Sequence, residues 1–216
     1  MTPQDASAHL RHICKLAPIV PVLVIEDAAH ARPLAQALVA GGLPVLEVTL
    51  RTGAALEAIS LMAGIKGAHV GAGTLITAQD VAEARDAGAT FGVSPGATDT
   101  LLDACEAHDL PLLPGAATAS EAMRLLSRGY TVQKFFPAEA SGGAAALRAI
   151  GGPLPQIAFC PTGGVSAANA ASYLSLPNVI CAGGSWIAPA NLMRAGRWDE
   201  ITQLARNAAR LAPAST

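Results

Sequence analysis

The feature that most constrains the fold is a repeat in which short apolar or β-branched runs alternate with alanine- and leucine-rich segments. The starts of successive runs lie 20 to 26 residues apart. The segments between them have the 3.6-residue periodicity of helices. Strands that alternate with helices in this way predict a parallel sheet. We expect eight strands, near residues 19–25, 44–50, 69–74, 90–94, 110–114, 131–136, 157–161 and 179–184.

Eight strand–helix units predict an α/β protein in which the strands close into a (β/α)8 TIM barrel. The 216 residues of the chain suit this architecture, which needs ~200 to 250 residues. A doubly wound open sheet is the alternative. No linker or shift in composition divides the sequence, so we expect a single domain over residues 1–216. An N-terminal helix near 5–16 precedes strand one, and a last helix covers 197–211. Glycines stand where three helices should end: Gly41, Gly88 and Gly129.

The composition indicates a folded protein without a nucleic-acid or membrane partner. Apolar residues make up 51% and charged residues 14%, which allows a large core. A formal net charge of −2 gives no support for binding to nucleic acid or an anionic membrane. The longest apolar run, 17–25, contains two prolines and is too short to span a bilayer. We find no signal peptide and expect a cytoplasmic protein.

The cysteines give no indication of disulfides or of a metal site. In a chain without an export signal, isolated cysteines are expected as buried free thiols. Cys105 and His108 would share a helix face, as would His9 and His12. Two ligands are too few for a metal site, so none is predicted. The four cysteines are Cys14, Cys105, Cys160 and Cys181.

The second predicted strand carries charged residues toward its carboxyl end, where TIM barrels hold their active sites. Because side chains alternate along a strand, Val45, Glu47 and Thr49 share one face, with Arg51 beyond them. That face points into the barrel. A buried carboxylate is costly unless it is paired or hydrogen-bonded. A structural ion pair between Glu47 and Arg51 is one reading of this strand, and a catalytic carboxylate is the other.

Lys134 lies in the sixth predicted strand, on the same face as Val132 and Phe136. The chain has only three lysines, and the alternation directs this one into the cavity that contains Glu47. Loss of water around the ammonium and the nearby Arg51 both favour the neutral amine. A neutral amine attacks a ketone and forms a Schiff base. The alternative is a surface lysine that extends its charge into water.

Glycine pairs follow the seventh and eighth predicted strands, where TIM barrels often bind phosphate. Gly163 and Gly164 precede a helix that Ser166 would cap, and Gly183 and Gly184 precede Ser185. Glycine lets the backbone approach an anion, and free N–H groups hold it. Ordinary turn glycines are the alternative. Pro95 and Pro114, in tight turns after strands four and five, would lie at the cavity mouth.

Segments in order along the chain are similar to those of 2-keto-3-deoxy-6-phosphogluconate aldolases, which also act as 4-hydroxy-2-oxoglutarate aldolases. The resemblance extends from about residue 19 to 210 and is most specific at Glu-Val-Thr-Leu-Arg and Lys-Phe-Phe-Pro. A Rossmann fold is excluded because Gly-Ala-Gly-Thr lacks the third glycine of the dinucleotide motif. The segments are GLPVLEVTLRT (42–52), GAGT (71–74), SPG (94–96), LPG (113–115), KFFPAE (134–139), FCPTGG (159–164) and GGSW (183–186).

The resemblance implies a class I aldolase on a (β/α)8 barrel that uses no metal or other cofactor and assembles as a homotrimer. It assigns the Schiff base to Lys134 and the general acid/base role to Glu47. The related phosphogalactonate branch looks less similar, because Thr162 and the Thr-Leu-Arg-Thr run follow the gluconate pattern. The remaining implied contacts are Arg51 and Thr74 with the pyruvyl carboxylate, Phe136 and Pro95 with the cavity wall, Thr162 with the substrate, and Gly163, Gly164, Gly184 and Ser185 near the phosphate.

The implied reaction is cleavage of 2-dehydro-3-deoxy-6-phosphogluconate to pyruvate and glyceraldehyde 3-phosphate, with 4-hydroxy-2-oxoglutarate as a possible second substrate. Three other functions stay open. An isomerase or epimerase would use Glu47 as base and Lys134 as an electrostatic group. A metal-dependent aldolase would need ligands that the sequence does not offer convincingly. A sugar-phosphate-binding protein without activity would bind the substrate and release no pyruvate.

Overall fold

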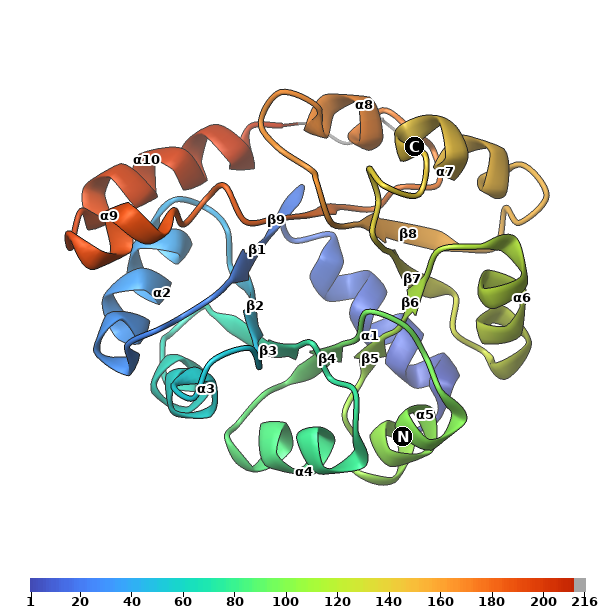
Figure 1. Ribbon diagram of the computed structural model, residues 1–216, viewed down its shortest axis with the longest axis horizontal. Helices are drawn as coiled ribbons and strands as arrows, with labels where there is room; N and C mark the ends of the chain where they lie inside the picture. Colours follow the sequence, from blue (N-terminus) through green and yellow to red (C-terminus); the bar gives the residue numbers. More distant parts are fainter. Residues whose placement is uncertain (212–216) are drawn as a thin grey trace.

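The computed structural model describes residues 1–211 and shows an α/β fold with parallel strands. The strands form a curve in the middle of the molecule, and most helices lie outside them (Figure 1). This arrangement follows from the sequence repeat, because each helix returns the chain to the start of the next parallel strand. The strands are β1 (Ile19–Leu23), β2 (Val45–Thr49), β3 (His69–Gly73), β4 (Phe91–Val93), β5 (Leu112–Leu113), β6 (Gly115–Ala116), β7 (Val132–Phe135), β8 (Ala158–Pro161) and β9 (Ala182–Gly184).

The strands form two parallel sheets. Six strands pair in the order β5-β4-β3-β2-β1-β9, and three pair in the order β6-β7-β8. The fifth predicted strand, 110–114, contains β5, and β6 follows directly after Pro114 but belongs to the other sheet. Proline has no N–H to donate to a ladder, which explains the interruption. On the other side, isolated bridges between Phe159 and Val179 and between Thr162 and Gly183 link β8 to the β9 segment.

The helices agree closely with the predicted ones. The predicted N-terminal helix is α1, where Thr2 accepts a hydrogen bond from the Asp5 N–H and Pro3 occupies the first turn. No helix within residues 1–211 has both the length and the apolarity needed to cross a membrane. The helices are α1 (Pro3–Cys14), η1 (Ala28–His30), α2 (Ala31–Ala40), α3 (Ala55–Ala63), α4 (Ala78–Asp86), α5 (Asp99–Ala107), α6 (Ala119–Arg128), α7 (Gly143–Gly151), α8 (Ala170–Leu174), α9 (Ala190–Arg194) and α10 (Trp198–Ala209).

The hydrophobic core has two parts. The larger part lies between the strands and the surrounding helices. The smaller part, which we call the inner cluster, consists of inward-facing strand residues packed on Leu10, Ile13 and Cys14 of α1. Figure 1 shows α1 crossing behind the curve of strands. The remaining members of the inner cluster are Val20, Val45, Phe91, Val93, Leu113, Val132, Cys160 and Cys181.

The four cysteines are free and buried, as the sequence predicted. Burial raises the pKa of the Cys105 thiol to about 12, with a further contribution from Glu106. Hydrogen bonds with Cys14 and Cys160, together with burial, raise the pKa of Cys181 well above its usual value. A thiol with a raised pKa is a poor nucleophile, so these cysteines act as small apolar core residues.

Gly41 is the C-cap of α2, as predicted, in a right-handed conformation, and the left-handed residue is Gly42, with φ +91°. Close packing also requires a glycine at position 41, because a Cβ there would lie 2.3 Å from the Cβ of Ala205 in α10. One local prediction was wrong. Ser166 does not cap a helix, since α8 begins at Ala170. The Ser166 N–H instead donates to the side chain of Asn169, at 2.7 Å.

Candidate active site

A cavity of about 360 Å³ opens at the carboxyl ends of the strands. Some lining residues belong to strands β1, β2, β7 and β9. The others follow a strand, and these strands are β1, β2, β3, β4, β7, β8 and β9. Its volume lies within the range typical of small-molecule sites. The lining residues are Val22, Val24, Glu47, Thr49, Arg51, Thr74, Pro95, Lys134, Phe136, Thr162, Gly163, Gly164, Val165, Gly183 and Ser185.

Lys134 and Glu47 form a buried ion pair inside this cavity. Strand β7 presents Lys134 and strand β2 presents Glu47, and the Lys134 Nζ donates to Glu47 Oε1 at 3.2 Å. The two residues are only 5% and 3% exposed, respectively. The Phe136 ring covers the amine, with 5.2 Å between Nζ and the ring centroid. A buried charge requires such a partner, so neither side chain fits an ordinary surface or core role.

Gly73 makes room for the glutamate of this pair. It ends β3, the strand next to β2, and a Cβ at this position would lie 2.5 Å from Glu47 Oε1. Any side chain here would displace the carboxylate. Sequence reasoning tested the Gly-Ala-Gly-Thr segment as a dinucleotide motif and included it in the family resemblance, but it gave Gly73 no role. The sequence signal for this role was a glycine at the end of the strand that follows the strand of Glu47.

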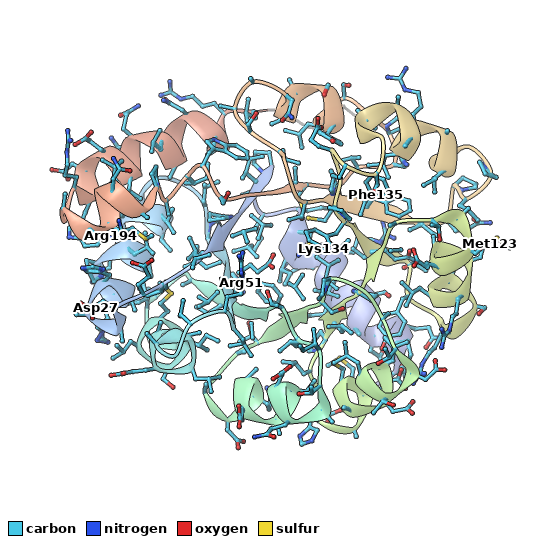
Figure 2. The ribbon with its side chains drawn as sticks, viewed as in Figure 1. Asp27, Arg51, Met123, Lys134, Phe135 and Arg194 are labelled. Atoms are coloured by element: carbon cyan, nitrogen blue, oxygen red, sulfur yellow. The ribbon has the colours of Figure 1, made fainter. Side chains whose placement is uncertain are left out.

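Arg51 does not pair with Glu47. Within residues 1–211 the Glu47 carboxylate pairs with Lys134, and no carboxylate forms an ion pair with Arg51. The labelled side chains of Arg51 and Lys134 both lie toward the middle of the strand curve (Figure 2). The Arg51 guanidinium is exposed and lines the same cavity, so it is available to a bound anion.

Thr74 enters the cavity through an uncommon backbone conformation. It follows β3 and has φ +65°, which is rare for a residue other than glycine. Such strained residues concentrate at functional sites. Thr49, which sequence reasoning placed on the face of Glu47 without giving it a role, also lines the cavity. Its Oγ1 donates to the Leu23 carbonyl at 2.9 Å, which leaves its methyl group and an acceptor lone pair for the cavity.

The turn after β8 presents backbone N–H groups to the cavity. Gly163 and Gly164 have φ values of +96° and +79°, which only glycine adopts easily. The Gly163 carbonyl accepts from the Glu139 N–H, and the Gly164 carbonyl accepts from Asn169 Nδ2, both at 3.0 Å. The N–H groups of Gly164 and Val165 have no acceptor in the part of the chain that the structure describes. Free donors of this kind suit an anion.

Ten of the eleven site residues from the sequence line the cavity, and Gly184 does not. Its missing side chain leaves space for Trp186, whose ring atom would lie 1.8 Å from a Cβ. Its neighbour Gly183 lines the cavity and makes room for Thr162 in the same way, with a Cβ-to-Oγ1 distance of 2.4 Å. Because side chains alternate along β9, Gly183 faces the cavity and the predicted Gly184 does not.

No group of three or more histidine, cysteine, aspartate or glutamate side chains within residues 1–211 is arranged to hold a metal ion. His9 lies near His12 and His69, and partial burial together with these two neighbours lowers the pKa of His9. The charged side chains that line the cavity are Lys134, Glu47 and Arg51.

A sequence model of one family, described as KDPG and KHG aldolase, matches residues 10–204. The chain belongs to this family. A 2-dehydro-3-deoxy-phosphogluconate aldolase from Pseudoalteromonas atlantica is 58% identical over 192 residues, which cover 88% of this chain and 89% of the relative.

Solved structures of KDPG aldolases have the same fold. The enzyme from Zymomonas mobilis ZM4, crystallised with 3-phosphoglycerate, superimposes with a TM-score of 0.91 at 46% identity and covers 97% of this chain and 100% of its own. The Legionella pneumophila enzyme superimposes with a TM-score of 0.89 at 46% identity, and the alignment covers 92% and 97% of the two chains. Its pyruvate was captured as a covalent carbinolamine intermediate.

Proposed function

We propose that this chain is a class I aldolase that cleaves 2-dehydro-3-deoxy-6-phosphogluconate to pyruvate and glyceraldehyde 3-phosphate. The observation that carries the proposal is the buried pair of Lys134 and Glu47, 3.2 Å apart in a cavity at the carboxyl ends of the strands. A lysine in such a place serves as a nucleophile toward a ketone. The captured carbinolamine of the Legionella relative supports Schiff-base chemistry in this family.

The first half of the mechanism forms the Schiff base. Lys134 transfers a proton to Glu47, its hydrogen-bond partner, and the resulting amine attacks C2 of the substrate. The carbinolamine takes a proton from Glu47 on its hydroxyl and loses water. An iminium ion between Lys134 and C2 remains, and Glu47 is again a carboxylate.

The second half breaks the carbon–carbon bond. Glu47 accepts the proton of the C4 hydroxyl, the C3–C4 bond breaks, and its electron pair moves into the iminium to give an enamine. Glyceraldehyde 3-phosphate leaves. Glu47 then returns the proton to C3, and water hydrolyses the iminium to free pyruvate and Lys134. One carboxyl group can act in each step because it lies beside the amine that carries the substrate.

The polar residues around the pair would orient the substrate. Arg51 has no carboxylate partner within residues 1–211, and its planar guanidinium suits the carboxylate of the pyruvyl group, with Thr74 beside it. Phe136 and Pro95 would form the apolar wall, and Thr162 would contact the substrate chain.

The glycine turn would bind the phosphate. Gly164, Val165 and Ser185 line the cavity, and the N–H groups of Gly164 and Val165 have no acceptor within residues 1–211. Gly163 and Gly164 allow the close approach that an anion needs. The backbone of Gly184, beside Ser185, belongs to the same proposed subsite, although it lies outside the cavity lining. The 3-phosphoglycerate in the Zymomonas structure is consistent with a phosphorylated ligand.

We also propose that the chain forms a homotrimer and works in the cytoplasm. For the fold, we propose that the two sheets close into one (β/α)8 barrel and that residues 1–216 form a single domain. The bridges between β8 and the β9 segment support closure on one side, and on the other side only Pro114 separates β5 from β6 along the chain. Residues 212–216 lie outside the described residues. Sedimentation equilibrium would test the trimer directly.

Reductive trapping tests the proposed function. Borohydride added with pyruvate should fix a three-carbon adduct on Lys134, and peptide mapping should locate the added mass there. Lys15 and Lys66 are the internal controls, because both lie outside the cavity. A coupled assay should show pyruvate release from 2-dehydro-3-deoxy-6-phosphogluconate, and it would compare 4-hydroxy-2-oxoglutarate as a second substrate. Substrate binding without adduct or pyruvate release would overturn the proposal.

A further inference from the structure

Glu139 and Tyr173 form a hydrogen-bonded pair behind the glycine turn. Tyr173 belongs to α8 and is 0% exposed, and its hydroxyl donates to Glu139 Oε1 in the loop after β7. Burial and the bond to Glu139 raise the pKa of Tyr173. The pair therefore joins the Lys-Phe-Phe-Pro segment to the helix that follows the turn. Neither residue lines the cavity.

The Glu139 side chain also supports the turn directly. A Cβ on Gly164 would lie 2.6 Å from the Glu139 Cβ and 2.5 Å from its Cγ, so the two residues pack without space between them. The Glu139 N–H holds the Gly163 carbonyl at 3.0 Å, and the Ala138 N–H holds the Thr162 carbonyl at 2.8 Å. The carbonyls of Thr162 and Gly163 are thereby fixed on the side of Glu139, and Asn169 holds the Gly164 carbonyl.

Fixing the carbonyls determines where the N–H groups point. Each peptide unit is planar, so its N–H is directed opposite to its C=O. The free N–H groups of Gly164 and Val165 can meet an anion only while the turn keeps its left-handed conformation. Glycine itself does not enforce this conformation, because it has wide backbone freedom. The enforcement must come from neighbours: the Glu139 side chain packs against Gly164, and Asn169 Nδ2 holds the Gly164 carbonyl.

We propose that Glu139, held by Tyr173, is a positioning residue that sets the glycine turn for the phosphate of the substrate and has no part in Schiff-base chemistry. The inference rests on the proposed function. A misplacement of ~1 Å at a binding group can cost up to ~10²-fold in rate. Loss of the Tyr173 bond would release the exposed Glu139 carboxylate and loosen the turn while Lys134 and Glu47 stay in place.

The test compares a phosphate-dependent readout with a phosphate-independent one. Tyr173→Phe and Glu139→Ala should raise the KM for 2-dehydro-3-deoxy-6-phosphogluconate and the inhibition constant of inorganic phosphate by ~10-fold. The rate of borohydride trapping with pyruvate should stay within ~2-fold of the parent rate. Glu139→Gln keeps the stem against Gly164 and an oxygen that accepts from Tyr173, so its KM should be close to that of the parent protein.

Tyr130→Phe is the matched control. The Tyr130 hydroxyl donates to Glu106 at 3.0 Å, and both residues lie outside the cavity. Tyr130→Phe therefore removes a tyrosine–glutamate hydrogen bond, as Tyr173→Phe does, but at a different place in the fold. This variant should leave both readouts unchanged. An unchanged KM in Glu139→Ala, or equal losses in KM and trapping, would overturn the inference. Failure of the parent protein to form the adduct would instead contradict the proposed function, so the two outcomes can be distinguished.

Discussion

The pairing of Lys134 with Glu47 joins residues 87 positions apart in the chain. Each comes from a different strand, and both point inward because side chains alternate along a strand. The chain has two other lysines, and neither lines the cavity. A single amine is thus enclosed with a single carboxylate, which is the combination that imine chemistry needs for repeated proton transfer.

At this scale we predict the effect of Gly73→Ala. The new methyl group would lie 2.5 Å from Glu47 Oε1, so the carboxylate must move away from Lys134. We expect kcat to fall by at least ~10-fold, with a loss of ~1–3 kcal/mol in the free energy of unfolding. Gly53→Ala is the control, because nothing lies within 4 Å of a Cβ at that position. Steady-state kinetics and urea denaturation check both variants, and a normal kcat for Gly73→Ala would show that Glu47 tolerates displacement.

Strand alternation predicted the shared face of Glu47 and Thr49 and the inward position of Lys134, because a period of two needs no knowledge of the tertiary structure. It did not predict which basic residue forms the ion pair with Glu47. Arg51 is close in sequence, but Lys134 is close in space, and only the packing of β2 and β7 into one molecule decides between them. The different positions of Gly183 and Gly184 have the same origin, since only the tertiary structure decides which of the two faces the cavity.

At the scale of the single element, α6 begins with a reciprocal set of hydrogen bonds. The Thr118 side chain accepts from the Glu121 N–H, and the Glu121 carboxylate accepts from the N–H groups of Ala117 and Thr118. These bonds outweigh partial burial and lower the pKa of Glu121 below its usual value of 4.5. A lowered pKa in the folded state means that the ionised carboxylate stabilises the fold, so its contribution is lost when it is protonated.

We therefore predict a pH-dependent effect of Glu121→Gln. The contribution of Glu121 is fully present above pH 4.5 and is lost as the pH falls through the lowered folded-state value. At pH 7 the variant should lose ~0.5–1 kcal/mol in the free energy of unfolding, and this difference should shrink toward zero in acid. Denaturation at several pH values checks it. Glu57→Gln, at an exposed position in the first turn of α3, should show no such trend.

The elements that the sequence predicted well are those with strong local signals. Helical periodicity and capping residues placed α1 and α10 within two residues of their observed ends. Pro114 was read as a turn residue, but its place between strands of two sheets depends on the pairing of both neighbours. The role of Gly41 was also hidden, because its close contact is with Ala205, in a helix far along the chain.

At the scale of the whole molecule, α1 contributes to the stability of the fold through the inner cluster and does not line the cavity. Leu10 is fully buried in the inner cluster, away from the residues that line the cavity. We predict that Leu10→Ala lowers the free energy of unfolding by ~2–5 kcal/mol and the melting temperature by at least ~4 °C. The kcat at 25 °C should stay within ~2-fold of the parent value. Calorimetry and kinetics on the same sample check this, and a large loss of kcat in folded protein would show that the two regions are coupled.

The overall fold was predictable because the repeat of strands and helices constrains the topology strongly. Parallel pairing follows from each helical connection, and the position of the cavity follows from the direction of the strands. The extent of strand pairing was not predictable. Short strands such as β5 and β6 leave few ladder bonds, so the division into sheets of six and three strands depends on the pairing of individual residues.

The closed inner end of the molecule has a consequence for turnover. Leu10 and Ile13 belong to the inner cluster and do not line the cavity, so in the proposed reaction both products would leave through the mouth that admits the substrate. Gly164, at the phosphate end of the proposed site, is exposed, whereas Lys134 is buried. In the proposed reaction the aldehyde would therefore stand between the keto acid and the solvent. Departure would be sequential, with the three-carbon phosphate first and pyruvate second, and condensation in reverse would require the opposite order of entry.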